Sequence, residues 1–383
     1  MAEVVALDLP GGPGFVSALE EAWRRGHAVA PLDRRLAPPA RRRLLAVLRP
    51  KWVVDQHGTH ACPDAQPTEE GDALVVATSG STGQPKAAVL THEAVAASAS
   101  ATSKRLGVDP AFHRWLACLP LSHIGGLAVI TRAILTGTPV RVHDGFEAER
   151  VEAEAGGNQD LLVSLVPTAL ARVDASRFAR ILLGGSAPPR GLPPNVVTTY
   201  GMTETGSGVV YDGLPLEGVE VALSPTDEVL LRGPTLLRAY RDGSVPLDRD
   251  GWLATGDAGH FDAAGRLHVD GRIRDMVVTG GENVWPAAVE DVLRHHEAVL
   301  EVAVSSRPDP EWGERLVACV VPMDHASPPT LSELRSLVRD HLAPFAAPKE
   351  LVLMGSIPRT GNGKVRREEL RRLLSAGQEA EPG

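Results

Sequence analysis

Short apolar segments alternate with longer amphipathic segments along residues 13–200. Ala28-Val29-Ala30 and Trp52-Val53-Val54 are typical of buried strands, because each is a short apolar run beside turn or polar residues. Thr91 is a favourable N-cap for a helix that ends at Leu106. Strands that alternate with helices predict an α/β fold with a largely parallel sheet.

The polar and apolar pattern changes twice further along the chain. Over about residues 217–270, short apolar runs between Gly and Asp turns predict a small β subdomain. From residue 274 onward, strands and helices are mixed over a length that suffices for an α+β domain. The expected N-terminal elements are helix, strand, helix and strand over 13–55, a loop over 57–71 and a strand over 87–90. The alternation of strands and helices continues with segments at 115–119, 126–135, 140–142, 161–165, 167–172, 180–183 and 196–199. The expected C-terminal elements lie at 287–294, 300–305, 314–322, 331–342 and 351–353, before a basic final helix.

Net charge, apolar content and cysteine content argue against several classes of protein. The net charge of −9 argues against a nucleic-acid-binding surface. No apolar stretch is long enough for a transmembrane helix, so no stable membrane insertion is expected. The acidic start Met1-Ala2-Glu3 lacks the basic region of a secretory signal. The cysteines, Cys62, Cys118 and Cys319, are odd in number and far apart, which favours reduced thiols in a cytoplasmic protein.

The segment from Thr78 to Lys86 carries the strongest chemical signal. It alternates hydroxyl residues with glycines and closes on a lysine, directly after a strand-like apolar run. Glycines let backbone N–H groups turn toward an anion, and hydroxyls and a lysine add donors and a cation. The spacing is not that of the common P-loop. The segment therefore predicts a phosphate-holding loop for ATP outside the P-loop class.

Two carboxylates, an arginine and a glycine pair form further candidate motifs along the chain. Glu204 follows a strand and is flanked by hydroxyls, which suits Mg²⁺ between a carboxylate and phosphates; an ordinary strand-to-turn junction is the alternative. Asp257, on a glycine turn, could accept ribose hydroxyls or cap its own turn. Arg272 could reach phosphate or ribose, or be solvated. Gly280-Gly281 allows close approach of a ligand or forms a simple hairpin.

Three basic side chains could act on the substrate. Lys364 lies between turn residues and a basic helix, and could neutralise a phosphate–carboxylate pair or be solvated. His123, between a strand and a helix, could line a substrate site or be a core or capping histidine. Arg132, inside the following helix, is either solvated or a carboxylate clamp.

The order of these motifs resembles the adenylate-forming (AMP-binding) superfamily of acyl-CoA synthetases, peptide-synthetase adenylation domains and luciferases. Within it, GGENVWP and YGMTETGSGVVYDGLPLEGVEV look most like the o-succinylbenzoate–CoA ligases of menaquinone biosynthesis. The resemblance covers about residues 13–374. The matching motifs are ATSGSTGQPKAA (77–88), LPLSHIGGL (119–127), LLGGSAP (182–188), TYGMTET (199–205), GWLATGD (251–257), GRIRDMVVTGGENVWPAAVE (271–290) and RTGNGK (359–364).

The resemblance implies a two-step ligase and a role for each matching residue. A carboxylate and ATP form an acyl-adenylate and pyrophosphate, and coenzyme A then displaces AMP. Lys364 bridges the carboxylate and α-phosphate, Thr203 contacts the α-phosphate, and Glu204 binds Mg²⁺. For ATP, the resemblance implies phosphate binding by Thr78, Ser79, Ser81, Thr82 and Lys86, and ribose binding by Asp257 and Arg272. Adenine and acyl binding is implied for Gly184, Gly185, Ser186, Tyr200 and Gly201. Substrate binding is implied for His123, Arg132 and Gly185, and a coenzyme A tunnel for Gly280 and Gly281.

The resemblance also implies two domains. A large N-terminal domain over residues 1–272 carries parallel-type sheets, and a small mobile domain over 273–383 rotates about a hinge near Arg274. Three departures from the family pattern are Ala87, where glycine is usual, Ser122, where an aromatic residue is frequent, and Arg274, where Asp or Lys is common.

Several points stay open at this stage. The first-choice substrate is o-succinylbenzoate, with another aryl or alkyl carboxylate, or transfer to a carrier protein or amine, as the alternative. A non-catalytic nucleotide-binding protein is a third hypothesis, which the joint presence of Lys86, Glu204, Asp257 and Lys364 disfavours. A homodimer is also left open.

Overall fold

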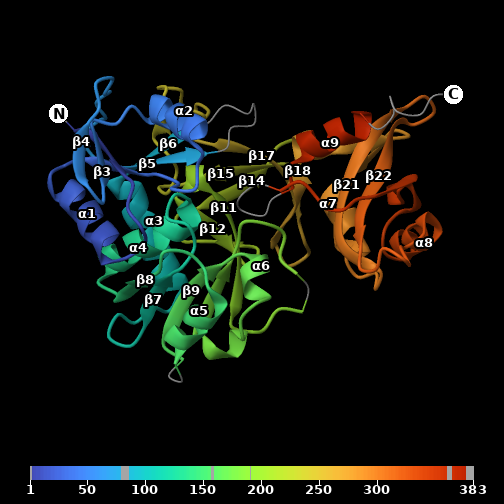
Figure 1. The fold of residues 1–383 in the computed structure, drawn as a ribbon, viewed down its shortest axis with the longest axis horizontal. Coiled ribbons are helices and arrows are strands. Elements are labelled where there is room, and N and C mark those ends of the chain that lie inside the picture. The colour runs from blue at the N-terminus through green and yellow to red at the C-terminus, as the bar shows by residue number, and fades with distance from the viewer. Residues whose placement is uncertain (1, 79–85, 157–158, 190, 360–364, 377–383) are drawn as a thin grey trace. The chain divides into compact units, whose positions relative to one another are not determined.

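The computed structural model describes residues 2–78, 86–156, 159–189, 191–359 and 365–376 (Figure 1). The chain divides into two compact units, each described by itself. The N-terminal unit comprises Met1–Ala222, Leu230–Ala254 and Ala263–Leu267, and the C-terminal unit comprises Leu223–Val229, Thr255–Asp262 and His268–Gly383. The boundary at residue 272 stays a prediction.

The N-terminal unit contains two seven-stranded sheets with helices against them. The first has the order β16-β6-β5-β2-β1-β3-β4, in which β5 lies parallel to β2 and antiparallel to β6. Its elements are β1 (Val4–Leu7), α1 (Pro13–Arg24), β2 (Ala28–Pro31), α2 (Pro38–Leu48), β3 (Trp52–Asp55), β4 (Gly58–Ala61), β5 (Asp72–Thr78), β6 (Lys86–Thr91), α3 (His92–Leu106) and β16 (Ala239–Tyr240).

The second sheet has the order β13-β12-β11-β10-β9-β7-β8. Strands β7 to β11 pair in parallel, and β12 joins β11 antiparallel. The elements are β7 (Arg114–Ala117), α4 (Ile124–Thr136), β8 (Val140–Val142), α5 (Ala148–Ala155), β9 (Leu161–Leu165), α6 (Pro167–Leu170), η1 (Ala175–Arg177), β10 (Arg180–Leu183), β11 (Val196–Met202), η2 (Thr203–Thr205), β12 (Ser207–Tyr211) and β13 (Leu214–Pro215).

A four-stranded sheet, β14-β15-β17-β18, follows in the region where a small β subdomain is predicted. Its strands are β14 (Glu220–Leu223), β15 (Glu228–Arg232), β17 (Leu253–Phe261) and β18 (Leu267–Arg272).

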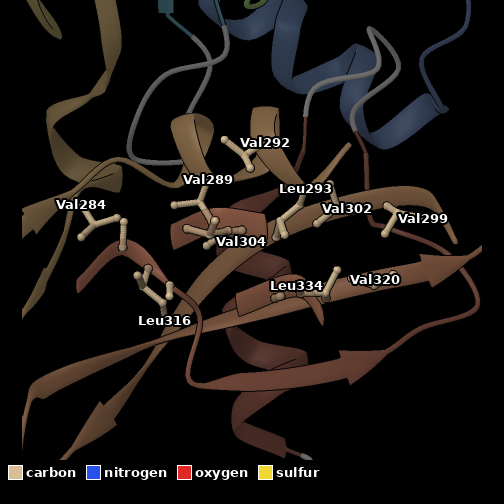
Figure 2. Packing of buried hydrophobic residues seen from close by; sticks show 14 of the residues in the cluster. Val284, Val289, Val292, Leu293, Val299, Val302, Val304, Leu316, Val320 and Leu334 are labelled. Carbon is tan, nitrogen blue, oxygen red and sulfur yellow. The ribbon is translucent and has the colours of Figure 1, made fainter. Parts of the chain in front are cut away.

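The C-terminal unit contains a five-stranded sheet with the path β20-β19-β22-β21 and β23 paired to β22. Apolar residues on one face of this sheet pack with α7 and α8 (Figure 2). Leu370 and Leu374 of α9 pack on Ala303, Val317 and Cys319. The elements are η3 (Ile273–Asp275), β19 (Val277–Thr279), β20 (Glu282–Val284), α7 (Pro286–Leu293), β21 (Val299–Asp309), β22 (Gly313–Pro322), α8 (Leu331–His341), η4 (Pro344–Ala346), β23 (Glu350–Leu353) and α9 (Arg367–Ala376).

The α/β fold class is confirmed, and so is the start of α3. The Thr91 hydroxyl accepts from the Ala94 N–H at 3.1 Å, as an N-cap residue does. The loop expected over 57–71 is wrong in part, because Gly58–Ala61 forms β4, an edge strand paired to β3. All four β4 residues are exposed, so no apolar alternation marks the strand. Among the described residues, no helix is long and apolar enough to cross a membrane.

Candidate functional site

The predicted phosphate loop connects two paired strands of the first sheet. Thr78, the last residue of β5, lies opposite Lys86, the first residue of β6. Ser79, Ser81 and Thr82 lie outside the described residues. Ala87, where the family usually has glycine, is buried against the apolar core of this sheet and pairs with Ala77. The departure at Ala87 therefore places a methyl group in the core.

Glu204 lies in a short 3₁₀ helix directly after β11, together with Thr203. The backbone before it is tightly constrained, because a Cβ on Gly201 would stand 2.3 Å from the Ser207 carbonyl oxygen. The pairing of β11 with β12 shifts register between Tyr200 and Gly201. The Glu204 Oε1 accepts a hydrogen bond from the Tyr240 hydroxyl at 3.0 Å.

The predicted adenine and acyl residues follow neighbouring parallel strands. Gly184, Gly185 and Ser186 come directly after β10, and Tyr200 lies in β11 beside it. The carboxyl ends of parallel strands meet at one edge of a sheet, where α/β proteins place their ligands. The structure thus brings this group to one sheet edge, although their contacts with a ligand stay predictions.

His123 is the N-cap residue of α4, and its carbonyl accepts from the Leu127 N–H at 3.0 Å. The pKa of the Asp33 carboxyl is lowered, mainly by a hydrogen bond from Arg35 and to a smaller extent by the His123 ring.

Arg132, later in α4, is 2% exposed, so the solvated alternative is wrong. Its Nη2 donates to the Ser207 hydroxyl at 3.2 Å, and its guanidinium lies 4.8 Å from the Trp115 ring centre. Among the residues that the structure describes, none accepts a hydrogen bond from Arg132 Nε, Arg132 Nη1 or Trp115 Nε1. Burial lowers the pKa of Arg132, against a smaller opposing effect of Tyr211. Within the described ranges, the Arg132 guanidinium is therefore buried with two of its three nitrogens lacking an acceptor.

Asp257 and Arg272, the predicted ribose residues, are brought together in the C-terminal unit. Arg272 Nε lies 2.8 Å from Asp257 Oδ1, and its Nη1 donates to the Thr255 carbonyl at 3.0 Å. The Asp257 side chain is 8% exposed, whereas the Arg272 side chain is 45% exposed. The guanidinium therefore orients a nearly buried carboxylate, an arrangement compatible with a hydroxyl-binding role.

Gly280 and Gly281 form the two-residue turn of a hairpin between β19 and β20. Both have positive φ, 61° and 82°, which favours glycine in such a turn. A Cβ on Gly280 would stand 2.7 Å from the Trp312 ring. The hairpin alternative is correct, and the tunnel role of the two glycines stays a prediction.

Arg274 lies in η3, the short 3₁₀ helix directly after β18. Its hinge role stays a prediction. Lys364 lies outside the described residues.

Burial makes two of the three cysteines unreactive. Cys118 and Cys319 are buried, and desolvation raises the pKa of each thiol to about 12. Neither is a nucleophile at neutral pH, because the thiolate is the reactive form.

Sequence reasoning missed Tyr240, Ser207 and Trp115, which contact the predicted residues Glu204 and Arg132. Ser207 lies in the same GMTETGS segment as Glu204, so its position was a usable signal. Tyr240 is brought to Glu204 by the pairing of β16 with β6. Trp115 meets Arg132 because α4 packs against β7.

Comparisons with known proteins bear on this site. The AMP-binding enzyme profile matches residues 56–229, and the AMP-binding enzyme C-terminal domain profile matches residues 288–364. A probable 2-succinylbenzoate–CoA ligase of Mycobacterium tuberculosis is 39% identical over 327 residues, covering 79% of this chain and 85% of that protein. The indoleacetate–CoA ligase of Aromatoleum aromaticum is 31% identical, covering 95% of this chain and 86% of that protein.

A solved structure agrees with these relatives. The o-succinylbenzoate CoA synthetase of Bacillus subtilis, solved with the acyl-adenylate OSB-AMP, superposes with a TM-score of 0.85 at 26% identity. The match covers 96% of this chain and 88% of that chain. The same protein has been solved with ATP and a magnesium ion. From its motifs, its fold and its relatives, we conclude that this chain belongs to the AMP-binding family of adenylate-forming enzymes.

Proposed function

We propose that the chain is an AMP-forming acid–thiol ligase whose carboxylate substrate is 2-succinylbenzoate. A carboxylate oxygen attacks the α-phosphorus of ATP, and the bond to pyrophosphate breaks. The thiolate of coenzyme A then attacks the acyl carbon, and the bond to AMP breaks. Relatives named for 2-succinylbenzoate support this substrate.

The observation that carries the substrate assignment is the buried guanidinium of Arg132. Burying a cation without full compensation is costly, so a ligand anion that restores its hydrogen bonds gains affinity there. 2-Succinylbenzoate has two carboxylates, of which one must react with ATP. The second is a suitable acceptor for Arg132 Nε and Nη1, the guanidinium nitrogens that lack acceptors among the described residues. Indoleacetate, the substrate in another relative's name, has only one carboxylate.

ATP and Mg²⁺ fit the described residues around β6 and η2. No group of three or more His, Cys, Asp or Glu residues that could hold a metal occurs within the described ranges. Glu204 offers a carboxylate beside the predicted phosphate residues, and Mg²⁺ commonly takes one or two carboxylates together with phosphate oxygens and water. When bound, Mg²⁺ would neutralise phosphate charge as pyrophosphate leaves. Lys86 would hold the same phosphates, and Thr203 the α-phosphate.

The remaining roles follow the family pattern. Asp257 and Arg272 would hold the ribose, while Gly184, Gly185, Ser186, Tyr200 and Gly201 would frame the adenine and acyl groups. Lys364 would offset the repulsion between the attacking carboxylate and the α-phosphate, which is the main electrostatic barrier to adenylation. His123 would contact the acyl group, and Gly280 and Gly281 would line the path of coenzyme A. Rotation of the C-terminal domain about Arg274 would switch the enzyme from adenylation to thioester formation.

The proposal is tested by ATP–pyrophosphate exchange over a set of carboxylic acids. We expect 2-succinylbenzoate to support exchange with a kcat/KM at least about 100-fold above indoleacetate and benzoate, because a buried ionic contact is lost with either monocarboxylate. Release of AMP with free coenzyme A, and no need for a carrier protein or amine, is the second expected result. Exchange with a monocarboxylate as the best substrate would overturn the substrate assignment.

A further inference from the structure

We propose that Tyr240 is a positioning residue that orients both Glu204 and Lys86 at the phosphate end of the nucleotide site. This inference rests on the proposed function, because it assumes that Glu204 serves Mg²⁺ and Lys86 serves phosphate. All three residues belong to the N-terminal unit.

One side chain contacts two groups of opposite charge. The Tyr240 hydroxyl donates to Glu204 Oε1 at 3.0 Å, and Lys86 Nζ lies 4.6 Å from the centre of the Tyr240 ring. The hydroxyl hydrogen bond engages one carboxylate oxygen of Glu204, which leaves the other oxygen for a ligand. The ring face attracts the ammonium without neutralising it. An acidic or basic residue at this position would instead pair with one of the two groups and repel the other.

The backbone of Tyr240 is held firmly on the strand that begins with Lys86. In the pairing of β16 with β6, Tyr240 lies opposite Ala88. The flanking residues extend this ladder, since Arg238 N–H donates to the Val89 carbonyl and Arg241 N–H to the Ala87 carbonyl. The Glu204 carbonyl accepts from the Leu237 N–H at 2.8 Å. The short strand thus ties the Glu204 backbone to the strand of Lys86.

Two arginine side chains fix the ends of this strand. Arg238 forms two hydrogen bonds, at 2.9 and 2.8 Å, with the carboxylate of Asp72, which is 2% exposed. Arg241 is buried and donates to the carbonyls of Leu48 and Pro67 at 3.0 and 2.9 Å. Tyr240, between these anchors, has little freedom to follow Glu204 or Lys86. It is the rigid partner, and the two charged side chains adopt the positions that it sets.

The hydroxyl remains a donor at neutral pH. Burial of the Tyr240 phenol, and next the nearby Glu204 carboxylate, raise its pKa above the ordinary value. The phenol therefore keeps its proton and continues to donate to Glu204 Oε1.

Isothermal titration calorimetry with ATP, with and without Mg²⁺, separates the two contacts. Tyr240→Phe keeps the ring and removes the hydroxyl, so we expect the affinity for MgATP to fall about tenfold while metal-free ATP binds within about twofold of the wild type. Tyr240→Leu removes the ring as well, so metal-free ATP should also bind about threefold more weakly. In pyrophosphate exchange, Tyr240→Phe should raise the Mg²⁺ concentration for half-maximal rate and keep kcat at saturating Mg²⁺.

Tyr211→Phe is the matched control, because it removes a buried tyrosyl hydroxyl that contacts Thr102 at 3.1 Å. It should lower the melting temperature and leave the ratio of MgATP to ATP affinity unchanged. A wild-type ratio in Tyr240→Phe would overturn the inference and leave the proposed function standing. A wild-type protein that binds ATP under neither condition would overturn both.

Discussion

Two buried charged groups, one in each unit, differ in how completely the protein compensates them. Glu290 of α7 accepts from the Val304 N–H at 2.8 Å and from Arg367 Nη1 and Nη2 at 2.8 and 3.2 Å. Arg367 also donates to the Val304 carbonyl at 2.7 Å, and its Nε lies 3.4 Å from Asp275. Among the described residues, the equally buried Arg132 guanidinium donates one hydrogen bond, to Ser207, and lies against the Trp115 ring.

The difference distinguishes a structural charge from one that awaits a ligand. A buried ion pair with satisfied hydrogen bonds joins elements of the fold, and removing one partner leaves an uncompensated charge. The Glu290–Arg367 pair joins α7, β21 and α9 in this way. A buried charge whose donors lack acceptors lowers the stability of the free protein. A ligand that supplies those acceptors offsets this cost.

The largest expected effect is that of Arg367→Met. It leaves the Glu290 carboxylate buried without its main partner, so we expect the C-terminal unit to lose about 3 kcal/mol of unfolding free energy. Urea denaturation followed by circular dichroism measures the loss. Glu290→Gln together with Arg367→Met should recover part of it, and a single variant as stable as the wild type would contradict the structural role.

The same substitution at Arg132 should have the opposite consequence. In Arg132→Met a partly compensated charge becomes an apolar side chain among buried residues, so the unfolding free energy should stay equal or rise. The KM for 2-succinylbenzoate should increase about 100-fold, and the KM for a monocarboxylate should change less than about threefold. Equal effects on both substrates would remove Arg132 from carboxylate recognition.

Ser207→Ala removes the hydroxyl that accepts from Arg132 Nη2 and should have a smaller effect. Loss of a single bond to a charged donor costs about 1.5 kcal/mol, so we expect roughly a tenfold rise in KM for 2-succinylbenzoate. Steady-state kinetics with a di- and a monocarboxylate provide the measurement. A change in KM for ATP alone would assign Ser207 to the nucleotide instead.

The smallest effect concerns His92, a half-buried titratable side chain at the start of α3. Burial lowers its pKa from the ordinary 6.5, against an opposing effect of Asp72. As the pH falls, the unfolded chain takes up this proton first, so stability declines as the pH drops through about 6.5. We expect His92→Gln to flatten the fall in melting temperature between about pH 7 and about pH 5. An unchanged slope would show that His92 does not contribute.

The elements that the sequence predicts well are those with a local signal. The Thr91 cap marks the start of α3, and the apolar run from Arg180 to Leu183 coincides with β10. Strand β4 escapes prediction because pairing with β3, and not burial, makes it a strand. Helix α5, with only Val151 and Ala155 buried, carries too few apolar positions to be recognised.

In the candidate site, too, residues with a local signal are predicted and residues placed by tertiary contacts are not. Residues inside contiguous motifs, such as Glu204 and Asp257, are identified from the sequence because glycines and hydroxyls surround them. Whether Arg132 is solvated or buried cannot be read from its helix, since burial depends on Trp115 and Ser207 from two strands of the second sheet. Tyr240 has no motif of its own, and its contact with Glu204 depends on pairing between β16 and β6.

The pairing of β16 with β6 also bears on how the protein avoids self-association. Strand β6 would otherwise present a row of unpaired N–H and C=O groups at the end of its sheet, a template for another chain. A two-residue strand covers these groups, and it is too short to template a further strand. Substitutions that detach β16, such as loss of Arg238, would therefore promote aggregation as well as disturb nucleotide binding.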